Sequence, residues 1–238
     1  ALAPDRVDLG IGKAPGGLPF TTKALQADRA PDAAGFEAKL NDLTAFLRGG
    51  VAEAHPLHGA RAYPEGGAEP ELFLLGGSTE SAEIAARTGW NFSFAGHFDG
   101  GDDYIRAGFD AYRQAAHRAP SLAVTAIIAP TQAIADARAA KQTIYRVHLP
   151  DGRNVNLPNE DAAKEYARQA GFTEYRLEER HPRILAGTAQ VVRTELDRLA
   201  SLFGIEEFFI DIPATDPAER LSSIRLLAGR QAQLAAAE

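Results

Sequence analysis

Short apolar runs alternate with stretches of helical periodicity along most of this sequence, and that alternation restricts the chain to few folds. The apolar runs predict strands at residues 6–12, 71–76, 91–95, 122–129 and 206–211. The helical patterns predict helices at residues 35–48, 79–88 and 104–117, around the stripe from Val192 to Phe203, and around Leu221 to Leu227. Because strands alternating with helices are joined by crossovers, we expect an α/β fold with a mainly parallel sheet.

Residues 143–182 interrupt this rhythm. Apolar side chains alternate on both sides of Asp151-Gly152, a dipeptide typical of a hairpin turn. A short helix is expected next, with Asn159 as its N-cap. We therefore expect residues 143–182 to form an insertion within one α/β domain spanning residues 1–238, since a chain of this length with 45% hydrophobic residues can bury one sizeable core.

Charge and composition exclude several classes of function. The net charge is −7 and the basic residues are scattered, so a nucleic-acid partner is not expected. Apolar stretches fall short of the ~20 residues that span a bilayer, and we expect a soluble, cytoplasmic protein. Cysteine is absent, which excludes disulfides, thiolate metal sites and a cysteine nucleophile. Methionine is absent too and the sequence begins at Ala1, so we expect a portion of a longer gene product.

The turn GGSTES at residues 76–81, between a predicted strand and a predicted helix, is the strongest candidate for a binding site. The first N–H groups of a helix lack intrahelical acceptors, and the helix dipole favours an anion there. Glycines let backbone approach a ligand, and Ser78, Thr79 and Ser81 can donate hydroxyl hydrogen bonds. An equally common explanation is that Ser78 or Thr79 is simply the helix N-cap.

Other signals are weaker. GIGKAPGG at residues 10–17 lacks the spacing of a phosphate-binding Walker loop, and the Rossmann glycine pattern does not occur at residues 76–81. His55 and His58 stand three residues apart in a Pro/Gly-rich loop, where ordinary surface histidines are favoured over metal ligands, so no metal is expected. His97 follows a predicted strand, where it either stabilises a loop or faces a ligand as a proton carrier.

Taken together, four segments of the sequence resemble the bacterial-luciferase-like flavin-dependent monooxygenases, and among them the group-one oxidoreductase branch. The segments are RVDLGIGKAPGG, ELFLLGGSTESAEIAARTGWNFSFAGHF, ILAGTAQVVRTELDRL and EEFFIDIPATDPAERLSSIRLLA. They keep the family's order and cover most of the chain. The resemblance implies a (β/α)8 barrel that binds FMN, which is usually supplied in reduced form by a separate NAD(P)H-dependent flavin reductase.

The resemblance also assigns residues. It places the FMN phosphate at Gly77, Ser78, Thr79 and Ser81, and it places Gly10 and Gly12 near the flavin. It matches His97 to the end of the family's FAHHF-like stretch, which implies a catalytic role beside the isoalloxazine ring. Lys13 stands where relatives usually have arginine, so the charge is kept but a two-pronged phosphate contact is lost. The resemblance also implies a homodimer, which is usual in the family.

The sequence departs from the family's pattern in the number of its strands. Five predicted strands cannot close an eight-stranded barrel, and the family's first three β/α units would lie before Ala1 or come from another chain. The leading hypothesis is an FMN-dependent monooxygenase that uses reduced flavin and O₂ to oxidise a small organic substrate. The alternatives are hydride transfer by a flavin- or deazaflavin-dependent enzyme of the same superfamily, and a non-catalytic flavin-binding protein.

Overall fold

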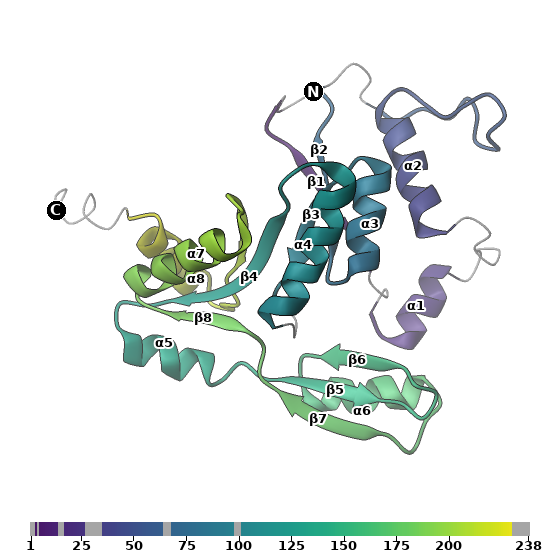
Figure 1. The fold of residues 1–238 in the computed structure, drawn as a ribbon. Coiled ribbons are helices and arrows are strands. Elements are labelled where there is room, and N and C mark those ends of the chain that lie inside the picture. The colour runs from purple at the N-terminus through teal and green to yellow at the C-terminus, as the bar shows by residue number, and fades with distance from the viewer. Residues whose placement is uncertain are drawn as a thin grey trace. The chain divides into compact units, whose positions relative to one another are not determined.

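The computed structural model describes residues 3, 5–13, 17–26, 35–63, 68–97 and 101–229 (Figure 1). The chain divides into two compact units, which are described separately below. The first consists of Ala1–Ala14, Asp28–Phe94 and Tyr104–Pro120. The second consists of Pro15–Ala27, Ala95–Asp103 and Ser121–Glu238. Among the described residues, no helix combines the length and apolar character that a bilayer crossing requires.

The first unit is built on three parallel strands. They are β1 (Asp8–Gly12), β2 (Glu71–Gly76) and β3 (Asn91–Ala95), with β2 pairing to both neighbours. The helices are α2 (Phe36–Leu47), α3 (Thr79–Thr88) and α4 (Asp102–Ala116). These elements confirm the alternation of strands and helices predicted for this part of the sequence, and Gly89 ends α3 in the left-handed conformation at φ 77°.

Aromatic side chains fill one side of this strand group. Phe92 and Phe94 of β3 point to the same face and contact Tyr112 and Phe109 of α4, with ring centroids 5.6 and 6.0 Å apart respectively. Gly108 of α4 leaves room for this contact, since a Cβ there would come within 2.7 Å of the Phe94 ring. The face with Phe92 and Phe94 is therefore the helix-covered face of the first unit.

The second unit contains another parallel group. Strand β4 (Ser121–Ile128) is buried along its whole length and pairs with β8 (Ile184–Gly187) and β9 (Phe208–Asp211). The helices α5 (Gln132–Ala139), α7 (Ala189–Phe203) and α8 (Pro217–Leu227) contact these strands. An uninterrupted apolar strand is what burial on both faces requires, as predicted for residues 122–129.

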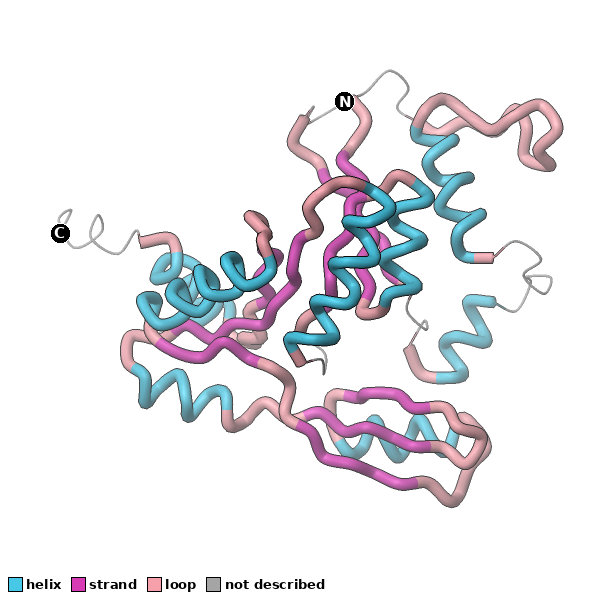
Figure 2. Tube along the Cα trace, viewed as in Figure 1, coloured by secondary structure: helices cyan, strands magenta, loops and turns pink. Residues whose placement is uncertain are grey.

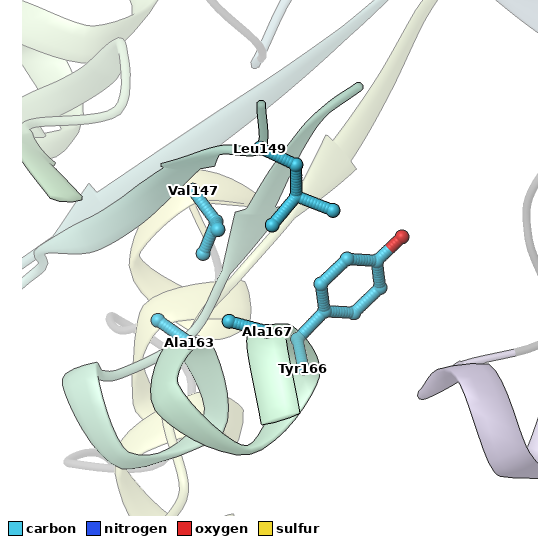
Figure 3. Packing of buried hydrophobic residues seen from close by; sticks show 5 residues of the cluster. All are labelled: Val147, Leu149, Ala163, Tyr166 and Ala167. Atoms are coloured by element: carbon cyan, nitrogen blue, oxygen red, sulfur yellow. The ribbon is translucent and has the colours of Figure 1, made fainter. Parts of the chain in front are cut away.

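A small antiparallel sheet lies within residues 143–182 of the second unit, where the sequence predicts an insertion. Its strands are β6 (Asn154–Leu157), β5 (Ile144–His148) and β7 (Arg176–Arg180), in that order, and helix α6 (Glu160–Gln169) covers one face (Figure 2). Ala163, Tyr166 and Ala167 of α6 pack against Val147 and Leu149 (Figure 3). Asn159 caps α6 by accepting from the Ala162 N–H at 2.8 Å, which confirms the predicted cap.

The sequence reading missed four elements. Strand β8 raises the parallel strands of the second unit to three, so the expected total of five strands was too low. Strand β7 completes the insertion, where only a hairpin and a helix were expected. Helices α1 (Pro19–Gln26) and α5 are short, eight residues each, and were not predicted. Of the glycine/proline-rich loop after β1, residues 14–16 lie outside the described residues.

Candidate functional site: the turn between β2 and α3

The turn after β2 lies where the sequence predicted an anion site. Strand β2 ends at Gly76 and helix α3 begins at Thr79, with Ser78 between them in an extended conformation. The Ser78 Oγ accepts a hydrogen bond from the Ser81 N–H at 3.2 Å, and the two Oγ atoms lie 3.1 Å apart. Ser78 is thus the N-cap of α3, so the capping explanation holds, and its hydroxyl is held beside that of Ser81.

Gly76 packs closely against the first turn of α3. A Cβ at this position would lie 2.4 Å from the Ser81 Cβ and 2.6 Å from its Oγ, far inside van der Waals contact. The backbone at Gly76 therefore packs directly against the Ser81 side chain. This close approach fixes the positions of the N–H groups that follow.

The open end of α3 can hold an anion. The Ser81 N–H is used by the cap, whereas the N–H groups of Thr79 and Glu80 are the first of the helix and have no intrahelical acceptor. Thr79 is exposed, so its hydroxyl can reach a bound group. The helix dipole contributes about half a positive charge here, while the exposed Glu80 carboxylate contributes the opposite sign. The residues present fit a phosphate bound mainly by N–H and hydroxyl donors.

The strand face opposite Phe92 and Phe94 carries Gly10 and Gly12 of β1 beside Phe73 and Leu75 of β2. Register places Gly12, Leu75 and Ser93 side by side on that face, and Gly10 lies two residues before Gly12 on the same face. Gly10 and Gly12 are exposed, and Leu75 keeps 39% of its surface exposed. Neither glycine presents a side chain of its own, but the Leu75 Cδ1 lies 3.0 Å from where a Cβ of Gly10 would stand, so the Leu75 side chain borders the backbone there.

Ser93 was not identified from the sequence. It is fully buried, and its Oγ has no hydrogen-bond partner within the described part of the chain. Buried hydroxyls are normally paired, so an unpaired one calls for an explanation. The signal was present in NFSFA, where a serine separates two phenylalanines of a buried strand.

His97 belongs to the second unit, whereas Gly10, Gly12, Gly77, Ser78, Thr79 and Ser81 belong to the first. His97 is half-buried, and burial lowers its pKa below the ordinary value, while the charge of Asp211 at the end of β9 opposes that shift. A neutral imidazole at neutral pH follows. Such a ring can accept or donate a proton, which is the chemistry expected of it. Phe98, which follows His97 in the stretch that resembles the family, lies outside the described residues.

The histidines at 55 and 58 have ordinary local partners. His55 Nε2 lies 3.3 Å from Asp42 Oδ1, and its Nδ1 accepts from the Leu57 N–H at 3.1 Å. His58 Nδ1 lies 3.4 Å from the carbonyl oxygen of Val51. Within the described ranges, no group of three or more metal-ligating side chains comes together.

No protein-family model matches this chain. It is 37% identical over 232 residues to the N-acetyl-S-alkylcysteine monooxygenase of Bacillus subtilis, covering 95% of this chain and 69% of that protein. A 97-residue part is 35% identical to a luciferase-like monooxygenase of Escherichia coli K12, covering 41% of this chain and 28% of that protein.

A solved structure also matches most of this chain. The crystal structure of apo-MsnO8 superimposes with a TM-score of 0.65 at 29% identity, covering 96% of this chain and 69% of the other. The chain thus spans about two thirds of the length of the proteins that it matches over most of its own length.

Proposed function

Because the chain belongs to the luciferase-like flavin-dependent monooxygenase family, an oxygenase family, we propose that it binds reduced FMN and uses O₂ to oxidise a small organic substrate. When bound in reduced form, FMN supplies the two electrons with which one oxygen atom of O₂ enters the substrate and the other leaves as water. The protein's own contribution is to bind, orient and shield the reactants. The geometry of the turn at residues 76–81 is the observation that carries this proposal.

We further propose that the parallel strands of the two units are strands of one (β/α)8 barrel. The alternation of strands and helices in these units and the complete burial of β4 support it. The remaining strands would come from residues that this sequence does not contain. In such a barrel, ligands bind at the carboxyl ends of the strands, which is where β2 meets the candidate turn.

Gly77, Ser78, Thr79 and Ser81 would hold the FMN phosphate. The N–H groups of the first helical turn would donate to phosphate oxygens, and the hydroxyls would add donors without adding charge. The Ser78 and Ser81 hydroxyls share one hydrogen bond, so one of their two hydroxyl hydrogens remains available to donate. Gly76 supports this arrangement by allowing the close contact with Ser81.

Gly10 and Gly12 would lie beside the flavin ring, on the face of β1 that the Leu75 side chain borders. His97 would hold or transfer a proton at one ring nitrogen, since its lowered pKa keeps it neutral at neutral pH. A separate NAD(P)H-dependent reductase would supply the reduced flavin, and the enzyme would act as a homodimer, both by the habit of the family.

The substrate proposal follows from the relative with 37% identity, which is named for an N-acetyl-S-alkylcysteine. We propose that this chain acts on the same chemical class, an N-acylated amino acid with a thioether side chain. The sulfur-bearing chain would be the oxidised part.

Titration with FMN and with riboflavin tests the phosphate site. Because riboflavin lacks the phosphate, the wild-type protein should bind FMN at least about tenfold more tightly, as measured by flavin fluorescence. Ser78→Ala should reduce that preference. The matched control is Asn159→Ala, which removes a helix cap of the same kind from α6 and should leave both affinities unchanged. Equal affinity of the wild-type protein for FMN and riboflavin would contradict the proposal.

A further inference from the structure

The small sheet of the second unit has two unlike faces. Val147 of β5 and Leu177 of β7 point toward α6 and share its apolar core. The alternate residues point to the other face, because side chains alternate along a strand. That polar face carries Arg146, His148, Asn156, Arg176, Glu178 and Arg180. Three arginines and one carboxylate give it a positive balance in a chain whose net charge is −7.

The one carboxylate of the polar face is already engaged. Glu178 lies 2.7 Å from His148 Nε2, 3.3 Å from Arg176 Nη1 and 3.3 Å from Arg180 Nε. The hydrogen bond from His148 holds the pKa of Glu178 below its ordinary value. Glu178 also stands opposite Arg146 in the register of β5 and β7, yet these three neighbours take its oxygens.

Arg146 and Asn156 face each other across β5 and β6. The Arg146 Nε and the Asn156 Oδ1 are both buried, and neither has a hydrogen-bond partner in the part of the chain that the structure describes. Directly paired side chains on one face of a sheet lie about 5 Å apart at their Cβ atoms. A donor and an acceptor therefore stand side by side, withdrawn from water and unsatisfied.

Two unsatisfied polar atoms in one cross-strand pair indicate a ligand. A buried donor or acceptor without a partner is costly, and such groups are rare unless something binds them. The guanidinium fork matches the two oxygens of a carboxylate. The amide oxygen of Asn156 needs a donor, and a backbone-like N–H next to a carboxylate provides one.

We propose that Arg146 binds the carboxylate of an N-acylated amino acid while Asn156 accepts a hydrogen bond from its amide N–H. This inference rests on the proposed function for its substrate class. A fully ionised phosphate or sulfate fits less well, because either would oppose the lone pairs of the Asn156 Oδ1 with oxygen lone pairs of its own. The arrangement selects for a carboxylate and an N–H donor in one small molecule.

Isothermal titration of the full chain, without flavin, tests the pair directly. The probes are N-acetyl-S-methylcysteine, its methyl ester, and the analogue in which the amide nitrogen is methylated. Wild-type protein should bind the free acid at least about tenfold more tightly than either analogue. Arg146→Gln should lose that factor for the acid and leave the ester unaffected. Asn156→Ala should lose the preference for N–H over N-methyl.

Arg153→Gln is the matched control, because Arg153 is an exposed arginine of the same hairpin that pairs with Asp151. It should bind all three probes like the wild-type protein. Thermal unfolding checks that the variants fold. Arg146→Gln removes a guanidinium whose Nε has no hydrogen-bond partner among the described residues, so the unfolding midpoint without ligand should not fall. A fall in that midpoint would show that Arg146 has a structural partner and would overturn the inference.

Three further results of the titrations would also overturn the inference. The first is that the wild-type protein binds the acid and the ester with equal affinity. The second is that Arg146→Gln binds the acid with the affinity of the wild-type protein, and the third is that inorganic phosphate displaces the acid at equal concentration. FMN titration separates this failure from that of the proposed function. FMN binding without Arg146-dependent acid binding refutes only the inference, and Arg146-dependent acid binding without FMN binding refutes only the flavin site.

Discussion

Trp90 donates its indole N–H to the Thr44 Oγ1 at 2.9 Å inside the core of the first unit. Both residues are buried, and the Thr44 hydroxyl in turn donates to the Leu40 carbonyl at 2.8 Å. The hydroxyl thus connects α2 to the residue that precedes β3. A polar contact of this kind fixes how α2 lies on the strands more sharply than apolar packing alone.

Replacing Thr44 with valine should destabilise the protein. The substitution keeps the shape but leaves the indole N–H buried without an acceptor, which costs about 1–3 kcal/mol. Urea unfolding monitored by Trp90 fluorescence measures the loss, and Thr44→Ser should restore most of it. Thr88→Val is the control, because the Thr88 hydroxyl bonds only to carbonyls of its own helix. Equal losses for the two valine variants would contradict the role given to Thr44.

Gly76→Ala should disrupt the candidate turn. The added methyl would stand 2.4 Å from the Ser81 Cβ, so backbone must shift, and overpacking of this kind typically costs about 1–3 kcal/mol. We expect lower thermal stability and weaker FMN binding. Adding Ser81→Gly should recover stability in part, since it removes the opposing Cβ. Gly101→Ala, at a position with open space around the added carbon, is the control. A Gly76→Ala variant as stable as this control would contradict the close packing.

Local chemistry made much of the fold predictable. The N-caps Ser78 and Asn159 each depend on a few neighbouring residues; Asn159 was predicted from the sequence, and Ser78 was one of the two candidates named for α3. Strand β8 was missed because its four residues follow the insertion directly, where no turn separates it from β7. Helix α1 was missed although it begins at Pro19, and proline is favoured at a first helical position.

The two candidate sites differ in how far they could be predicted from the sequence. The turn at residues 76–81 is contiguous in sequence, so its hydroxyls and glycines could be recognised together. Arg146 and Asn156 are ten residues apart and meet only through the register of β5 and β6. The hairpin turn at Asp151-Gly152 was recognised, yet which face each side chain takes depends on the register. Ser93 likewise gains meaning only when its hydroxyl is seen to be buried.

Glu80→Gln should raise the affinity for FMN. The exposed Glu80 carboxylate stands in the first turn of α3, where its charge opposes a bound phosphate. We expect tightening of about two- to fivefold at low salt, shrinking at about 1 M salt, where screening is strong. Riboflavin affinity should not change, because it carries no phosphate. Glu83→Gln, one helical turn further on and ion-paired with Arg87, is the control. An unchanged FMN affinity in Glu80→Gln at low salt would place the phosphate elsewhere.

His97 should make stability depend on pH. Burial lowers its pKa from 6.5, so the folded protein binds this proton less readily than the unfolded chain does. The free energy of unfolding should therefore decrease as pH falls from about 6.5 toward the lowered pKa, and stay level below it. His97→Gln should show a shallower decrease between pH 7 and 5 in urea unfolding.

The charge of Asp211 opposes this shift, so Asp211→Asn should lower the pKa of His97 further and move the window of decreasing stability to lower pH. NMR titration of the His97 ring proton measures the pKa directly, with Asp197→Asn on helix α7 as the exposed-carboxylate control. If Asp211→Asn raised the pKa of His97 or left it unchanged, the carboxylate at the end of β9 would not act on the ring. A lower pKa would instead show that the Asp211 carboxylate favours the protonated form of the His97 ring. A residue that holds a proton near a reacting site needs such stabilisation of its protonated form.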